Sequence, residues 1–167
     1  EWGRGELGIG NRDTEDGLVR GLGDPSAEVR GHCARVLADL GVTRAVDSLV
    51  ELLADADPGV RRHAADALGR LGNARQRGAG PLCRLLDDPC ADVRAASAMA
   101  LGRLGDTRSL VVEPVRRRLR DSCADVRAAS AKALGKLEDA GGASALVPLL
   151  DDPEPSVQRS AAWALSQ

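Results

Sequence analysis

The sequence predicts an all-α fold, a right-handed α-solenoid of about five helical hairpins. A motif of a leading valine followed by alanines and leucines recurs every 31 to 33 residues, which is the period of helical-hairpin arrays. The apolar residues inside each copy follow a helical period, and no stretch of the sequence alternates β-branched and polar residues as a strand would. Units of this kind bury their apolar faces against their neighbours. The copies begin at Val29, Val60, Val93, Val126 and Val157.

The second helix of each hairpin is predicted to follow the valine. In the copy that begins at Val60, Ala64, Ala67, Leu68 and Leu71 form one helix face. An aspartate stands five residues before each valine, at Asp24, Asp55, Asp88, Asp121 and Asp152, and a proline follows it in three copies. Aspartate accepts hydrogen bonds from the free amides of a helix start, and proline is tolerated in a first helical turn. We therefore expect the helices to begin at these aspartates.

Glycines mark two further positions of the repeat. Twelve residues after the valine, Gly41, Gly72 and Gly105 have the place of a left-handed helix terminator, and Glu138 departs from this rule. A second set, Gly69, Gly102 and Gly135, falls in mid-helix, where glycine costs about 1 kcal/mol relative to alanine. We expect a neighbouring helix to approach closely at these three glycines.

The first helices are predicted in shorter, leucine-rich segments, at residues 46–53, 81–86, 110–119 and 143–150. Residues 1–13 are glycine-rich and lack the motif, so we expect a flexible or partner-bound lead-in in which Trp2 is either an anchor or incidental. The repeat array then occupies residues 14–167. Neither end shows a polar capping repeat, so the array is expected to be a fragment of a longer one.

The stretch from Asp88 to Asp106 follows the pattern Asp-Pro-x-x-x-Val-Arg-x-x-Ala-Ala-x-Ala-Leu-Gly-x-Leu-Gly-Asp nearly whole, with Ser97 in place of the first of the two adjacent alanines. This pattern resembles the HEAT repeat, in particular the short subclass found in phycobiliprotein lyases, and the resemblance extends over residues 14 to 167. It implies that second helices line a concave face and that the arginines after the valines meet an aspartate of a neighbouring repeat. These arginines are Arg30, Arg61, Arg94 and Arg127. HEAT-like arrays act as scaffolds, adaptors, transport factors and occasionally enzymes.

Composition limits the function. The net charge is −2, which argues against general nucleic-acid binding because such domains carry a basic excess. No stretch has the roughly 20 apolar residues needed to span a membrane, and no signal-peptide pattern occurs, so we predict a soluble protein without direct membrane insertion. The four cysteines form no C-x-x-C pair. Free thiols fit a cytosol-like compartment, with an organelle interior left open.

The sequence predicts no catalytic, cofactor-binding or metal-binding residues, and therefore no enzyme and no cofactor. It contains neither a nucleophile arrangement nor a phosphate-binding loop. His32 and His63 each stand three residues after a valine and should stack in adjacent repeats. This resembles the iron-binding helices of deoxyhypusine hydroxylase, but there a glutamate follows each histidine, and here Cys33 and Ala64 follow. A polar patch is the prediction.

The predicted partner-binding surface consists of exposed positions of the second helices. Its residues are Arg70, Met99, Arg103, Lys132, Lys136 and Trp163, around a shallow floor of Ala95, Ala96, Ala128 and Ala129. An acidic or amphipathic segment of another protein fits such a surface. Trp163 is either an interface hot spot or is covered by a further repeat. Arg116, Arg117, Arg118 and Arg120 form a secondary basic patch, which is either a solvated helix face or a docking patch.

The function predicted from these observations is a non-catalytic protein–protein scaffold or adaptor, a soluble subunit of a larger assembly that binds through its concave face. One alternative is a phycobiliprotein-lyase-like protein that holds a bilin and its acceptor protein, as the repeat subclass implies. A less favoured alternative is binding of the nucleic-acid backbone. The identity of the partner and the oligomeric state stay open.

Overall fold

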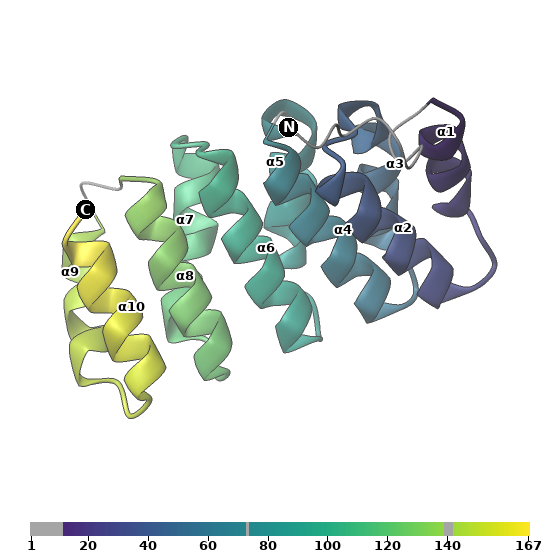
Figure 1. Ribbon diagram of the computed structural model, residues 1–167. Coiled ribbons are helices and arrows are strands. Elements are labelled where there is room, and N and C mark those ends of the chain that lie inside the picture. The colour runs from purple at the N-terminus through teal and green to yellow at the C-terminus, as the bar shows by residue number, and fades with distance from the viewer. Residues whose placement is uncertain (1–11, 73, 139–141) are drawn as a thin grey trace, which may run out of the picture.

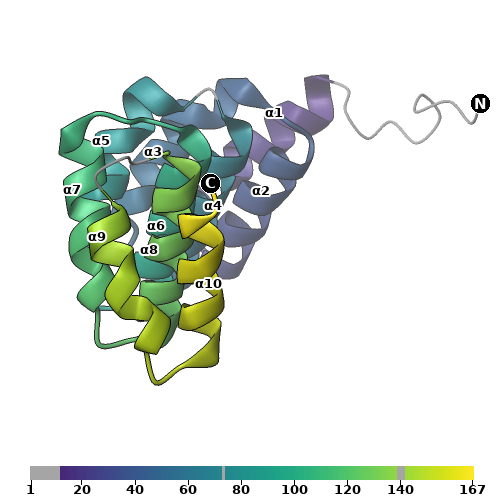
Figure 2. The same cartoon turned by 90° about the vertical axis from the view of Figure 1, so that its left-hand side faces the viewer.

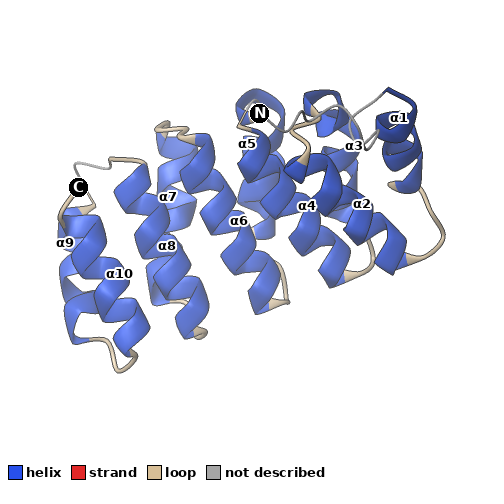
Figure 3. Cartoon of the chain, viewed as in Figure 1, coloured by secondary structure: helices blue, strands red, loops and turns tan. Residues whose placement is uncertain are grey.

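The structure is a computed structural model that describes residues 12–72, 74–138 and 142–167. Over these residues it is helical and contains no strand (Figure 3). The five predicted hairpins are all present. The predicted lead-in lies outside the described residues, including Trp2, except that residues 12 and 13 already belong to the first helix.

The helices form two layers along one axis (Figures 1 and 2). The first helices of the hairpins are α1 (Arg12–Gly21), α3 (Val46–Glu51), α5 (Arg75–Leu85), α7 (Ser109–Arg117) and α9 (Ala143–Leu146). Short 3-10 segments precede α3 at Thr43–Ala45 and follow α3, α7 and α9 at Leu52–Ala54, Arg118–Arg120 and Val147–Asp151. The second helices are α2 (Ala27–Asp39), α4 (Pro58–Leu71), α6 (Ala91–Leu104), α8 (Ala124–Lys136) and α10 (Pro155–Leu165).

The core lies between the two layers and between successive second helices. Two positions counted from each of the first four valines are fully buried: the alanine five residues after the valine and the leucine eight residues after the valine. These leucines are Leu37, Leu68, Leu101 and Leu134, and these alanines are Ala34, Ala65, Ala98 and Ala131. Because alanine is short, the second helices pack closely and contact one another far more extensively than successive first helices do.

The second set of glycines lies in the last turn of α4, α6 and α8, later in the helix than predicted, and each faces the backbone of the next second helix. A Cβ atom on Gly69 would lie 2.7 Å from the Cα of Ala100, one on Gly102 would lie 2.7 Å from the Cα of Ala133, and one on Gly135 would lie 2.8 Å from the Cα of Ala164. These separations are shorter than any van der Waals contact, and the atoms involved are backbone. The predicted reason for these glycines is therefore confirmed.

The helix ends follow the sequence rule. Gly41, Gly72 and Gly105 have positive φ values of 69°, 68° and 64°. Glu138, the residue that departs from the rule, also has a positive φ, 48°. A residue with a Cβ atom is strained there, so repeat four keeps the backbone geometry without the residue that suits it.

The helix starts differ from the prediction by two residues. The N-cap residues are Ser26, Asp57, Cys90, Cys123 and Glu154, each two residues after the recurring aspartate. The aspartate accepts a hydrogen bond from the backbone N–H of that N-cap residue, at 2.8 to 3.0 Å. The prolines next to the aspartates consequently lie in loops, and the prolines in first helical turns are Pro58 and Pro155. Four of the five aspartates, all except Asp24, also have a second partner.

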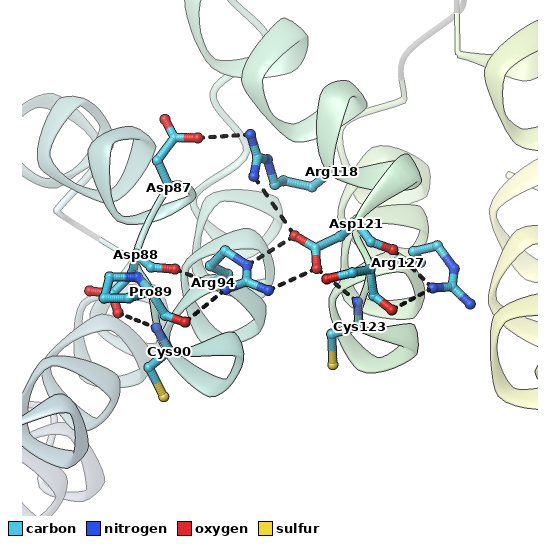
Figure 4. A network of polar contacts seen from close by, with 10 residues as sticks. Asp87, Asp88, Pro89, Cys90, Arg94, Arg118, Asp121, Cys123 and Arg127 are labelled. Atoms are coloured by element: carbon cyan, nitrogen blue, oxygen red, sulfur yellow. Dashed lines mark hydrogen bonds and ion pairs between the residues drawn. The ribbon is translucent and has the colours of Figure 1, made fainter.

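That partner is the arginine of the preceding repeat (Figure 4). Nε and Nη2 of Arg94 donate to the two carboxylate oxygens of Asp121, at 2.9 and 2.8 Å. Nη1 of Arg94 donates to the backbone carbonyls of Asp88 and Pro89, which begin its own repeat. The side chains of Arg94 and Asp121 are only 13% and 4% exposed.

The same arrangement recurs at each junction from repeat one to repeat five. We call the set the arginine–aspartate ladder: Arg30 with Asp55, Arg61 with Asp88, Arg94 with Asp121 and Arg127 with Asp152. All eight hydrogen bonds between guanidinium and carboxylate measure 2.7 to 3.1 Å. In repeat five, Gln158 replaces the arginine and keeps only the bond to a carbonyl, that of Asp152. The predicted structural role of the arginines is confirmed.

The ladder makes stability depend on pH. The hydrogen bond from Arg30 holds the pKa of Asp55 below its usual range, and Arg127 does the same for Asp152. A carboxyl whose pKa is lower in the folded state stabilises the fold above its unfolded pKa of about 4, and this contribution is lost as the pH falls through the folded pKa. We expect the free energy of unfolding in urea, followed by circular dichroism, to fall steadily between about pH 4 and pH 2. An unchanged free energy across that range would contradict this reading.

The close helix approach gives a second prediction. Replacing Gly102 with alanine should lower the free energy of unfolding by about 1–3 kcal/mol, because the added methyl overlaps the backbone of α8. The control is Gly17→Ala in α1, where the nearest atom to a Cβ is 3.9 Å away and alanine should stabilise by about 0.5–1 kcal/mol. Chemical denaturation of both variants measures the two effects. A Gly102→Ala variant as stable as Gly17→Ala would show that the helices do not pack as described.

Candidate binding surfaces

The six predicted partner-binding residues all lie on second helices. Arg70 is on α4, Met99 and Arg103 are on α6, Lys132 and Lys136 are on α8, and Trp163 is on α10. They do not gather at one place. The surface of the second helices instead has shallow depressions between neighbouring helices. Met99 lines two of them, together with Lys132 in one and Arg103 in the other.

The depression across α6, α8 and α10 has a volume of about 360 Å³ and is called the α8 depression below. Ala128 and Ala129 form its floor, as predicted, and Met99 and Lys132 border it. Arg159 from the start of α10 borders it as well. Neither Lys132 nor Arg159 has a carboxylate within ion-pair distance among the described residues. The sequence reading missed Arg159, although its position two residues after a valine places it on an exposed row.

The neighbouring depression across α4 and α6 has a similar volume, about 380 Å³, above the alanines Ala95 and Ala96. Two of the charges that line it are paired with each other, since Arg103 binds Asp66 at 2.5 Å. Arg70 binds Asp39 at 2.5 Å and lies 3.9 Å from Asp66. Two of the six predicted residues therefore form exposed ion pairs between repeats, which each contribute about 0–1 kcal/mol. These pairs leave less positive charge for a nucleic-acid backbone.

Lys136 and Trp163 lie beyond the α8 depression. Lys136 is exposed and has no carboxylate partner within the described part of the chain. Trp163 is 40% exposed. Its ring lies against α8 where Gly135 leaves room, since a Cβ on that glycine would be 2.9 Å from Cζ3 of the indole. One side of the indole thus packs on the array and the rest is open to solvent.

His32 and His63 line one depression between α2 and α4, together with Gly31 and Arg35. Gly31 makes room for the inner imidazole: a Cβ there would be 2.7 Å from Nδ1 of His63. Burial and the positive charges of Arg62 and Arg35 lower the pKa of His63. Among the residues that the structure describes, no three His, Cys, Asp or Glu side chains come together as metal ligands. His32 and His63 therefore form a polar patch at the edge of this depression.

The secondary basic patch lies on the layer of first helices and divides into two pairs. Arg116 binds Glu113 at 2.6 Å. Arg118 binds Asp87 at 2.7 Å and lies 3.7 Å from Asp121 (Figure 4). Arg117 and Arg120 are exposed and have no such partner in the described ranges. Both border a further depression between α7 and α9.

The four cysteines are free thiols, and burial raises the pKa of Cys33 and Cys83. A raised pKa keeps these two thiols protonated and weakly nucleophilic.

None of the described helices is long and apolar enough to cross a membrane.

Comparison with known proteins agrees with the repeat geometry. Over its whole length the chain is 27% identical to a chain in the complex of CpcE and CpcF of phycocyanin lyase from Nostoc sp. PCC7120, with a TM-score of 0.81 and 70% of that chain covered. A designed armadillo repeat protein in complex with the peptide (KR)4 is 24% identical over 89% of this chain and 79% of its own, with a TM-score of 0.67. A search of curated protein sequences finds no match.

The family assignment rests on most of the chain. The sequence pattern of HEAT repeats matches residues 15–79 and 79–166, which includes every hairpin described above. The two solved structures reported above share the overall arrangement of this chain, with TM-scores of 0.81 and 0.67. The chain belongs to the HEAT-repeat family.

Proposed function

We propose that this chain is a non-catalytic scaffold or adaptor that binds an acidic or amphipathic segment of a partner protein along its second helices. The observation that carries the proposal is the α8 depression. Its alanine floor admits a segment close to the helix backbone, and Met99 adds an adaptable apolar wall. Asp125 also lines it, but neither Lys132 nor Arg159 has a carboxylate within ion-pair distance among the described residues, so each is able to pair with a carboxylate of a partner.

The packing of the helices supports the choice of this face. Successive second helices contact each other closely, and successive first helices do so much less. In a curved array the more closely spaced row is the inner one, so the second helices would line the concave side. A concave face lets one segment touch several repeats at once, which suits extended peptides and helices.

The exposed side chains along the second helices α6, α8 and α10 are of types that bind a partner rather than catalyse a reaction. From α6 to α10 they offer a thioether, three cations and the partly exposed indole of Trp163. Aromatic and cationic side chains are the groups that dominate interface energetics. An armadillo array of the same fold binds a basic peptide, and the uncompensated cations here favour an acidic one. A surface of this kind suits a protein that acts as one subunit of a larger assembly.

A second candidate function is a bilin- and acceptor-binding role like that of a phycobiliprotein lyase. The observation that favours it is the 27% identity to a chain of the CpcE–CpcF complex over the full length of this chain. The chain contains no Phe or Tyr, which leaves few side chains to stack on a tetrapyrrole. Absorbance of free bilin should therefore stay unchanged when this protein is added, and a shifted, intensified band would favour the lyase-like role.

The scaffold proposal predicts a charge-dependent partner. Replacing Lys132, Lys136 and Arg159 with glutamine should lower recovery of the partner from native lysate at least tenfold, because each lost cation weakens attraction to carboxylates. The measurement is quantitative mass spectrometry of co-purified proteins. The matched control replaces Arg12, Arg20 and Arg84 with glutamine, since these three cations are exposed on first helices. Equal recovery by both variants would place the interface elsewhere.

A further inference from the structure

The first helices of neighbouring repeats are joined by exposed ion pairs. At each of the first three junctions, an arginine of the later repeat binds a carboxylate of the earlier one. The pairs are Arg44 with Glu15 and Asp16, Arg77 with Asp47, and Arg118 with Asp87. One arginine at each of these three junctions is thus matched by a carboxylate of the neighbouring repeat.

The junction of repeats four and five breaks this pattern. Here repeat four contributes the arginines, and the residues of repeat five that face them are Ser144, Ala145 and Pro148, none of which is acidic. Arg117 and Arg120 consequently keep exposed guanidiniums without a carboxylate within ion-pair distance in the described part of the chain. Two positive charges are left uncompensated on a protein whose net charge is −2.

The same junction is hollowed. Helix α9 is only one turn long and continues as a 3-10 segment through Pro148, and its small side chains leave a depression of about 350 Å³ between α7 and α9. We call it the α7–α9 depression. Leu119, Leu149, Ala145 and Pro148 give it an apolar lining, and Arg117 and Arg120 border it. Glu113 and Arg116 line it as well, and their charges pair with each other.

Size and chemistry together define an occupant. The volume is at the low end of the roughly 300–1,000 Å³ of small-molecule sites, so it suits one or two apolar side chains better than a whole ligand. Guanidiniums bind carboxylates through paired hydrogen bonds. We propose that the α7–α9 depression is a second docking site, which takes an apolar side chain of an acidic amphipathic helix while flanking carboxylates bind Arg117 and Arg120.

This site is independent of the surface proposed above. It lies on the layer of first helices, and the α8 depression lies on the layer of second helices (Figure 2). A scaffold with two such surfaces can hold two segments at once, which raises the effective concentration of one at the other. Either proposal can fail without the other.

The test uses a fluorescein-labelled synthetic peptide of about 12 residues, with two leucines four positions apart on one helix face and glutamates around them. Fluorescence anisotropy gives its affinity, and amide chemical shifts of the labelled protein locate it. We expect shifts in residues 113–120 and 144–149. We also expect Arg117→Gln with Arg120→Gln to weaken binding at least tenfold.

Two further variants separate the cavity from the charges. Ala145→Leu fills the depression but keeps every charge, and it should also weaken binding at least tenfold with an unchanged circular dichroism spectrum. The control, Arg84→Gln with Lys136→Gln, removes two cations elsewhere, one of them at the position of repeat three that matches Arg117, and should bind as the unaltered protein does. The triple variant of Lys132, Lys136 and Arg159 should also retain binding.

Three results would overturn the inference. The first is shifts confined to the second helices, which would assign the peptide to the α8 depression. The second is unweakened binding by Ala145→Leu or by the double arginine variant. The third is equal affinity for a peptide whose leucines are replaced by alanine, which would show a purely electrostatic surface.

Discussion

The arginine–aspartate ladder is the interaction on which the arrangement of the repeats depends. Each aspartate receives two hydrogen bonds from the arginine of the preceding repeat and one from the backbone that begins its own second helix. Each arginine also binds the two carbonyls at the start of its own repeat. One pair thus fixes a loop, a helix start and the spacing of two repeats. Because both side chains are largely buried, loss of either partner leaves an uncompensated charge.

Small residues make this spacing possible. The guanidinium reaches the next aspartate only if the second helices lie close, and the glycine–alanine contacts between α4, α6, α8 and α10 permit that approach. The cost of glycine within these helices is offset by backbone contact and by burial of the leucines beneath. The alanine surface that results is also shallow enough to receive a partner segment. The small residues of the second helices therefore account for both the close packing and the shape of the proposed binding surface.

Much of the fold was predictable from the sequence because the determinants recur in register. The valine spacing predicted five hairpins and the recurring glycines predicted close contacts, whereas the ladder was implied by the resemblance to the HEAT repeat. The helix starts were displaced by two residues because each recurring aspartate accepts from the backbone N–H of the residue two positions later, which becomes the N-cap. Four of the five aspartates also bind a distant arginine, which local capping rules do not consider. Glu138 shows the reverse case, where the backbone geometry persists after the favoured residue is lost.

The binding surfaces were less predictable. Helical position showed that Arg70 and Arg103 lie on second helices, but their pairing with Asp39 and Asp66 joins residues 31 and 37 positions apart and needed the structure. Arg159 was missed because only the structure brings the start of α10 beside Met99 and Lys132. The basic run in repeat four was visible, but its division needed the structure, which brings Glu113 to Arg116, Asp87 to Arg118 and no carboxylate of the described residues within ion-pair distance of the other two arginines.

A double-mutant cycle on Arg94 and Asp121 tests the central role of the ladder most directly. Alanine is placed at each position and at both, and the free energy of unfolding is measured for all four proteins. The ladder predicts a coupling energy above about 1.5 kcal/mol. The exposed pair Arg77–Asp47, with side chains 67% and 64% exposed, should give below about 0.5 kcal/mol. Equal, small coupling energies at both pairs would contradict the account, because the repeats would then be held by apolar packing alone.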